Sequence, residues 1–245
     1  MFSLYQGTLF SHCRDSLVID PDFLELAAHE NSDGLRELVQ ATIDKIDSKD
    51  YEAILLGYGL CGNGLAGIRA RSKPLVLPRA HDCCTILLGS SSRFLEEFGE
   101  DLSAPWSSCG YVEREAEYMR SSEYGKESGF GLEYKELAEK YGEENAAYLW
   151  EALHPETDEG LRRFIDLDSS KNLNRADLVR RDAEAAGKEF KIIKGNDRIL
   201  RSLVYGHWDD SDFLLVKPGE EIKALYDLVR VVEAAPKEGG AFHLS

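Results

Sequence analysis

The stretch 57-GYGLCGNGLAGIRARSKPLVLPRAHDCC-84 decides how the fold and the site are interpreted. It begins where a short apolar run, at about 52–57, ends in glycine, and it contains a second apolar run at 74–78. Both runs have the length and the flanking glycine or proline of buried strands. A glycine-rich loop joins the two predicted strands, and His-Asp-Cys-Cys follows the second at once.

Helix-like and strand-like segments alternate on both sides of this stretch. The segment 33–48 has the spacing of an amphipathic helix, and its predicted apolar stripe is Leu35, Leu38, Val39, Ile43 and Ile46. Further helices are expected at 83–100 (interrupted near Gly89), 134–154, 175–187 (between an Asn174 N-cap and Gly187), 197–205 and, as a helix or a docked tail, 222–235. Further strands are expected at 4–10, 190–195 and 212–220.

This alternation predicts an α/β fold with an open, mostly parallel sheet and helices on both faces. A helical insertion of about 101–185 is expected in the middle, and its first part, 101–130, is interpreted as a surface loop or lid. We expect residues 1–245 to form a single domain.

The composition excludes several classes of protein. Of the 245 residues 43% are hydrophobic, which is enough for a globular core. The 45 acidic residues outnumber the 29 basic ones, and the net charge of −16 disfavours nucleic acid and anionic membranes as partners. No apolar run reaches the roughly 18–20 residues of a membrane span, and no export signal is recognised. We therefore expect a cytoplasmic protein whose five cysteines serve as thiols or metal ligands.

The glycines of the loop spell G-x-G-x-x-G twice, a pattern typical of dinucleotide-binding turns. The context disfavours that function, since too few residues follow Gly67 for a long helix and no acidic residue ends the 74–78 run. We expect the glycines to bend the chain toward a site at the end of the strand. The predicted substrate-binding residues are Gly59, Asn63, Gly64 and Arg79.

Cys61 follows the first predicted strand, and His81 and Cys83 follow the second. Loops that follow neighbouring parallel strands leave the same edge of a sheet, where α/β proteins place their ligands. Two thiolates and an imidazole are a known catalytic zinc set, with an open fourth position. That fourth position could also be filled by Cys84 or Cys109, which would close the site.

Two carboxylates are catalytic candidates. Asp82 lies between the predicted ligands and has three possible roles: to cap the following helix, to orient His81, or to act on substrate. Glu113 is expected to contact substrate from the loop after Gly110. A site without metal is the alternative, with Cys83 as nucleophile and His81 as base.

The sequence also resembles the domain of unknown function 1638 family. The resemblance lies in YGLCGNGL at 58–65, LVLPR at 75–79 with His-Asp-Cys at 81–83, LLGS at 87–90, KYGEENA at 140–146, and the segment 208–219. The resemblance implies that the cysteine of YGLCGNGL and the His-Asp-Cys segment belong to the family's sequence pattern. It also implies an association with corrinoid-dependent methyl-transfer systems. In place of the family's Gly-Trp-x-Glu, this chain has Gly110-Tyr111-Val112-Glu113.

Together these observations predict a zinc enzyme that activates a small thiol, or water, at Cys61, His81 and Cys83. Its specific form is methyl transfer from a corrinoid protein to a thiol. Two alternatives stay open: a non-enzymatic accessory protein of a methyltransferase system that binds metal or corrinoid, and a metal-free cysteine enzyme.

Overall fold

The structure, a computed structural model, divides the chain into two compact units. The site unit lies within Tyr5–Leu102 and Gly195–Ser245, and the insertion unit lies within Ser103–Lys194. That residues 1–245 form a single domain stays a prediction. The residues that the structure describes are 19–24, 32–99, 106–110, 112, 134–153, 161–167, 169–227 and 229–236.

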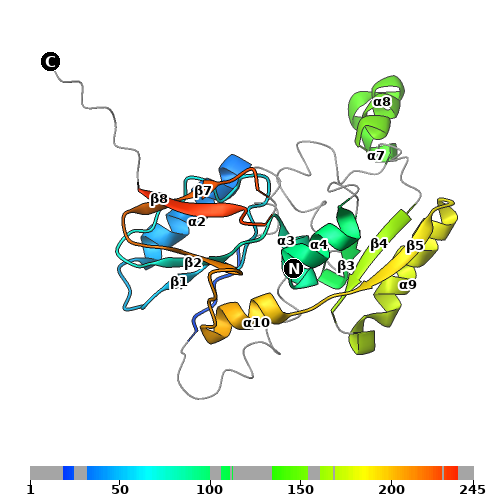
Figure 1. The fold of residues 1–245 in the computed structure, drawn as a ribbon. Coiled ribbons are helices and arrows are strands. Elements are labelled where there is room, and N and C mark those ends of the chain that lie inside the picture. The colour runs from blue at the N-terminus through cyan, green and yellow to red at the C-terminus, as the bar shows by residue number, and fades with distance from the viewer. Residues whose placement is uncertain are drawn as a thin grey trace. The chain divides into compact units, whose positions relative to one another are not determined.

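A three-stranded sheet forms the centre of the site unit (Figure 1). Strand β1 (Ile54–Leu55) runs parallel to β2 (Leu75–Pro78), and β6 (Phe213–Val216) pairs with the other edge of β2 in the antiparallel sense. All four residues of β2 are buried, as expected of an apolar run in the middle of a sheet. The predicted strands at 52–57 and 74–78 are therefore present, and the first is shorter than predicted.

Helix α2 (Ser32–Ile46) covers this sheet with its apolar stripe. The predicted residues Leu35, Val39 and Ile43 are buried in the same core as β1 and β2. Leu38, which the spacing assigns to the same stripe, is exposed because it lies at the margin of the buried face.

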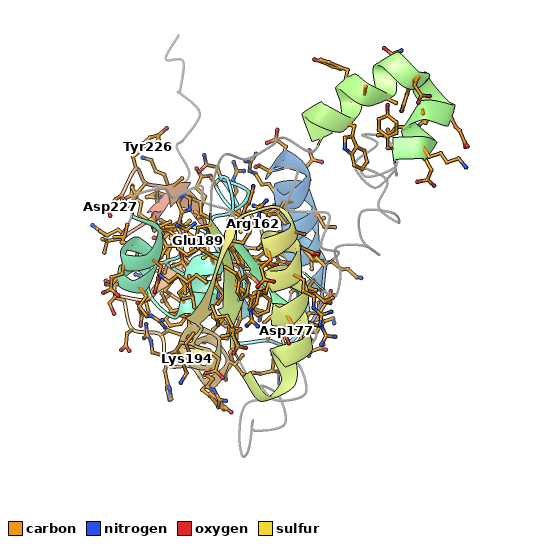
Figure 2. The ribbon with its side chains drawn as sticks, turned by 90° about the vertical axis from the view of Figure 1, so that its right-hand side faces the viewer. Arg162, Asp177, Glu189, Lys194, Tyr226 and Asp227 are labelled. Atoms are coloured by element: carbon orange, nitrogen blue, oxygen red, sulfur yellow. The ribbon has the colours of Figure 1, made fainter. Side chains whose placement is uncertain are left out.

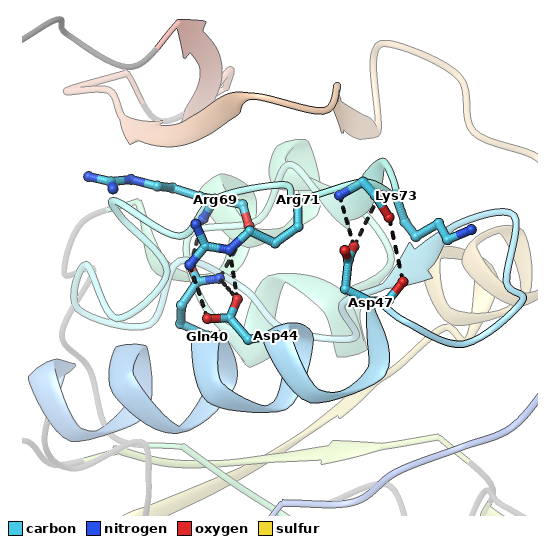
Figure 3. Close-up of polar contacts among 7 residues, drawn as sticks. Gln40, Asp44, Asp47, Arg69, Arg71 and Lys73 are labelled. Carbon is cyan, nitrogen blue, oxygen red and sulfur yellow. Dashed lines mark hydrogen bonds and ion pairs between the residues drawn. The ribbon is translucent and has the colours of Figure 1, made fainter.

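The polar face of α2 is tied to the segment that leads into β2 (Figure 3). Gln40 exchanges two hydrogen bonds with the backbone of Arg69, and Asp44 accepts two from the guanidinium of Arg71. Asp47 accepts from two backbone N–H groups just before β2, at 2.9 and 3.2 Å. These contacts fix the chain on its way from the glycine-rich loop into β2.

Two short helices follow β2 and are separated at Gly89, as predicted. They are α3 (Cys83–Leu88) and α4 (Ser91–Phe98), and Gly89 has a φ of +84°. Such a left-handed residue ends a helix at little cost only when it is glycine. Helix α10 (Arg198–Tyr205) binds this junction, since the Arg198 guanidinium donates to the carbonyl oxygen of Gly89.

Residues 220–236 form a β-hairpin, so of the two forms expected at 222–235 the helix is wrong, and the segment docks on the glycine-rich loop. Strand β7 (Glu220–Ala224) pairs antiparallel with β8 (Val232–Pro236). The extended form is stabilised by a partner far away in sequence. The backbone of Ile222 exchanges hydrogen bonds with the glycine-rich loop, which include Gly67 N–H to Ile222 O at 2.7 Å.

The insertion unit has a parallel sheet of its own. Its strands are β3 (Trp106–Ser108), β4 (Leu161–Asp166) and β5 (Glu189–Lys194), and all pairings are parallel. Helix α9 (Ser169–Ala185) connects β4 to β5 as a parallel crossover requires. Figure 2 shows Arg162 and Glu189 near one end of these strands and Lys194 near the other.

Several boundaries in this unit differ from the prediction. The segment 134–154 is two helices, α7 (Tyr134–Tyr141) and α8 (Glu143–Leu153), which are separated at Gly142. Helix α9 begins before Asn174, so Asn174 is not its N-cap. The predicted loop 101–130 contains β3, and most of its other residues lie outside the described ones, as does the predicted strand 4–10.

The predicted α/β class is confirmed. Three of the five strand pairings in the described residues are parallel, while β2–β6 and β7–β8 are antiparallel. The strands are divided among three sheets, where the prediction had a single open one. The described parts of the chain contain no helix that is long and apolar enough to cross a bilayer.

Replacement of Arg79 by Met is expected to lower the free energy of unfolding by about 2–4 kcal/mol. Arg79 follows β2 directly, and only 7% of its side chain is exposed. Its guanidinium donates to the backbone oxygens of Asp210, Arg230 and Val232. In the Met variant these oxygens would lose their charged hydrogen-bond donor.

Urea denaturation of wild type and variant measures this change. Arg71→Met is the control, because the Arg71–Asp44 pair is well exposed and should contribute at most about 1 kcal/mol. Equal losses in the two variants would contradict a structural role of the buried guanidinium.

Candidate functional site

The pairing of β1 and β2 continues into the loops that follow them. Leu60 N–H donates to Ala80 O at 2.8 Å, and Cys61 N–H donates to His81 O at 3.0 Å. Because β1 and β2 are parallel, both loops leave the same edge of the sheet. The structure thus brings Cys61 beside the His-Asp-Cys segment, as the sequence predicted.

Gly59 allows the two loops to approach closely. A Cβ atom at this position would lie 2.6 Å from the backbone carbonyl carbon of Asp82, well inside van der Waals contact. Gly64 is similarly confined, since its Cβ would lie 2.7 Å from a methyl group of Leu35. These two predicted substrate-binding residues thus have a structural reason to be glycine, and substrate contact stays a prediction.

The loop then turns through three consecutive residues with left-handed backbone. The φ angles of Cys61, Gly62 and Asn63 are +46°, +61° and +68°. This conformation is unfavourable for residues that carry a Cβ, and such residues are frequent at functional sites. It leaves Cys61 half-buried and Asn63 exposed.

The side chains of Cys61 and Cys83 meet. Their thiols are hydrogen-bonded, and the Cys61 sulfur also accepts from the backbone N–H of Cys83. The hydrogen bond to Cys83 raises the pKa of the Cys61 thiol, and burial and the negative charges of Cys83 and Asp82 act in the same direction. Two ionised thiolates would repel each other here, so the pair retains a proton until a cation or a covalent bond compensates it.

His81 lies beside this pair, and its ring is held from one side. It stacks on Phe94 of α4, with the ring centroids 6.1 Å apart and the planes inclined by 22°. Its Nδ1 atom is buried without a hydrogen-bond partner, and the nearest carboxylate oxygen, on Asp82, is 3.9 Å away. Interaction with the Asp82 carboxylate raises the pKa of His81, and burial partly offsets this.

Asp82 is the N-cap of α3, the first of the three roles considered for it. One carboxylate oxygen accepts from the backbone N–H of Thr85 at 2.9 Å and from its hydroxyl at 3.1 Å. The other oxygen is the one that faces His81. Asp82 therefore both fixes the start of α3 and places negative charge beside the imidazole.

The other candidate residues are placed as follows. Arg79 is occupied by backbone carbonyl oxygens and the Asp210 carboxylate, and its role in substrate binding stays a prediction. Cys84 is buried within α3. Cys109 is buried in the core of the insertion unit. Glu113 lies outside the described residues.

In the described residues, no three side chains of the types His, Cys, Asp or Glu lie close enough together to hold a metal ion. Cys61 and Cys83 are in contact, whereas the His81 imidazole is directed toward Phe94 and Asp82. The donor chemistry nevertheless suits zinc, because two cysteine sulfurs in contact and the imidazole of His81 come from the same pair of loops.

Sequence reasoning missed three residues that position the site. Ser32 and Arg36, both on α2, donate to the carbonyl oxygens of Gly62 and Asn63 at 2.8 and 3.1 Å and so hold the left-handed turn. Phe94 supports the His81 ring. A serine at the start of an amphipathic helix was a usable signal, whereas the contacts of Arg36 and Phe94 depend on the tertiary fold.

A family model described as "Protein of unknown function (DUF1638)" matches residues 23–204, about three quarters of the chain. The chain belongs to the DUF1638 family. The match covers both loops of the site and all of the insertion unit that the structure describes. No curated protein and no solved structure matches the chain.

Gly59→Ala is expected to destabilise the protein by about 1–3 kcal/mol, since its methyl group must displace the backbone of Asp82. Gly57→Ala is the matched control, because a Cβ there meets nothing within 4 Å and the φ of Gly57 is not positive. It should change stability by at most about 0.5 kcal/mol. Urea denaturation measures both, and a harmless Gly59→Ala would contradict the close approach of the loops.

The pKa of His81 is expected to lie above its usual value of about 6.5 and to fall in Asp82→Asn, which retains a capping oxygen but loses the charge. Because the folded-state pKa is raised, the stabilisation is present below about pH 6.5 and is lost as the pH rises through the folded-state value.

NMR titration of the His81 ring protons measures this pKa. Thr85→Ala is the control, since it weakens the cap of α3 but leaves the carboxylate beside His81 in place. An unchanged His81 pKa in Asp82→Asn would show that the carboxylate does not act on the imidazole.

Proposed function

We propose that this DUF1638 protein is a zinc-dependent enzyme whose ion is held by Cys61, Cys83 and His81. The observation that carries the proposal is the contact between the Cys61 and Cys83 thiols at the C-terminal edge of a parallel strand pair. His81 adds an imidazole with an unpartnered Nδ1 from the same loop. Sulfur and imidazole nitrogen are the ligands that zinc prefers in proteins.

Metal binding must change the protonation of the two cysteines. The Cys61–Cys83 pair holds a proton because the Cys61 pKa is raised, so metal binding must release it. The three donors are not gathered in advance, and the His81 side chain must therefore reorient on binding. Asp82, which faces the imidazole, is suited to orient His81 from outside the metal.

A zinc ion with sulfur ligands and an open position lowers the pKa of a bound thiol or water and keeps it nucleophilic. The chain itself would supply the binding surface for a small thiol, with the exposed Asn63 and the glycines of the turn at its margin. In the specific form of the proposal, the thiol accepts a methyl group from a corrinoid protein. This reaction suits the cytoplasm, where thiols stay reduced.

We expect about one zinc per chain in protein purified without chelator, and loss of that zinc in Cys61→Ser, Cys83→Ser and His81→Ala. Elemental analysis of the folded variants measures this. Cys84→Ser is the matched control, because Cys84 neighbours Cys83 in sequence but is buried within α3. Wild-type protein that contains no zinc, and takes up none when it is added back, would overturn the proposal.

The two alternatives predict different results for zinc content, thiol binding and cysteine reactivity. A closed site of an accessory protein would retain zinc but would not accept an added thiol, which the absorption spectrum of cobalt-substituted protein reveals. A metal-free cysteine enzyme would contain no zinc and would show rapid alkylation of Cys83. The thiol contact supports that second alternative too, since an adjacent protonated thiol stabilises a thiolate.

A further inference from the structure

The Cys61 and Cys83 thiols are also placed to react with each other, and such a reaction needs no metal. None of the four cysteines in the described residues is in a disulfide, and Cys61 and Cys83 are the two among them that are partly exposed. Cys84 and Cys109 are buried. The accessible thiols are thus the ones that meet.

The backbone holds these two thiols in place from both sides. Cys61 is anchored by its N–H donated to His81 O, and Cys83 is the first residue of α3, whose N-cap is Asp82. The Cys83 N–H in turn donates to the Cys61 sulfur. Sulfurs in hydrogen-bond contact need only a small side-chain rotation to reach the bonding distance of about 2.05 Å.

We propose that Cys61 and Cys83 form a reversible intramolecular disulfide by exchange with a low-molecular-weight disulfide such as oxidised glutathione. This inference goes beyond the proposed function and does not depend on zinc. It does imply that oxidation and metal binding exclude each other, because a disulfide removes both sulfur donors.

The exchange proceeds in two steps. The Cys83 sulfur, which accepts the hydrogen bond from Cys61, attacks one sulfur of the glutathione disulfide and releases one glutathione thiolate. The Cys61 sulfur then loses its proton, attacks the Cys83 sulfur of the mixed disulfide and releases the second glutathione. The two cysteine thiols are oxidised by two electrons, and one glutathione disulfide is reduced to two thiols.

The test uses the full chain, reduced and stripped of metal with a chelator, and then exposed to oxidised glutathione. The thiols that react under denaturing conditions should fall from five to three, and reductant should restore them. Tryptic mass mapping should link the peptide 50–69, which contains Cys61, to the peptide 80–93, which contains Cys83 and Cys84. Cys84→Ser should retain the link, and Cys83→Ser should abolish it.

Three results would overturn the inference: five thiols that persist, glutathione that stays attached to Cys83 as a mixed disulfide, or a link that involves Cys84 in place of Cys83. Phenylarsine oxide gives an independent measure in unmutated protein, because it bridges only thiols that lie close together. A stable adduct that links the same two peptides supports the inference, and its absence opposes it.

The outcome is distinguishable from that of the proposed function. Protein without zinc that forms the link leaves this inference standing and overturns the zinc proposal. Protein whose zinc depends on Cys61 and Cys83, but which forms no link once stripped, overturns this inference alone.

Discussion

The hydrogen bonds that join residues 60 and 61 to residues 80 and 81 are the constraint on which the site depends. Strand β1 has only two residues, yet its pairing with β2 resumes beyond the strands and guides both loops side by side. The approach is possible because Gly59 has no side chain to meet the backbone of Asp82. The contact of the two thiols and the start of α3 at Cys83 follow from it.

The elements that the sequence predicted well are those whose signal is local. Helix α2 follows from its apolar spacing, and the breaks at Gly89 and after α9 follow from glycines with positive φ. The hairpin β7–β8 was missed because its apolar residues also fit a helical period. What makes it extended is pairing with the glycine-rich loop, about 150 residues earlier, through Ile222. The start of α9 was missed because the segment 168–174 contains several residues of the types that cap helices, so the sequence does not single out one of them as the N-cap.

The features of the site also fall into those that the sequence predicts and those that depend on tertiary contacts. The contact of Cys61 with the His-Asp-Cys segment was predictable, because loops that follow neighbouring parallel strands must leave one edge. The direction of the His81 ring was not, since Phe94 and Asp82 decide it together. The contacts of Arg79 could not be predicted from the sequence either. An arginine after a strand can serve a substrate or the fold, and the carbonyl oxygens that it binds lie more than 130 residues later, at Asp210 and in the hairpin β7–β8.

The antiparallel strand β6 is needed to cover the strand that leads into the site. It shields the edge of β2 that does not face β1, and the hairpin after it supplies two of the backbone acceptors of Arg79, Arg230 O and Val232 O. A fragment that ended after α10 would leave a row of unpaired N–H and C=O groups along a wholly apolar strand. Such an edge invites pairing with other chains and aggregation. A fragment that carries the two cysteines therefore needs β6 to cover β2, and it needs the hairpin β7–β8 to retain the acceptors of Arg79.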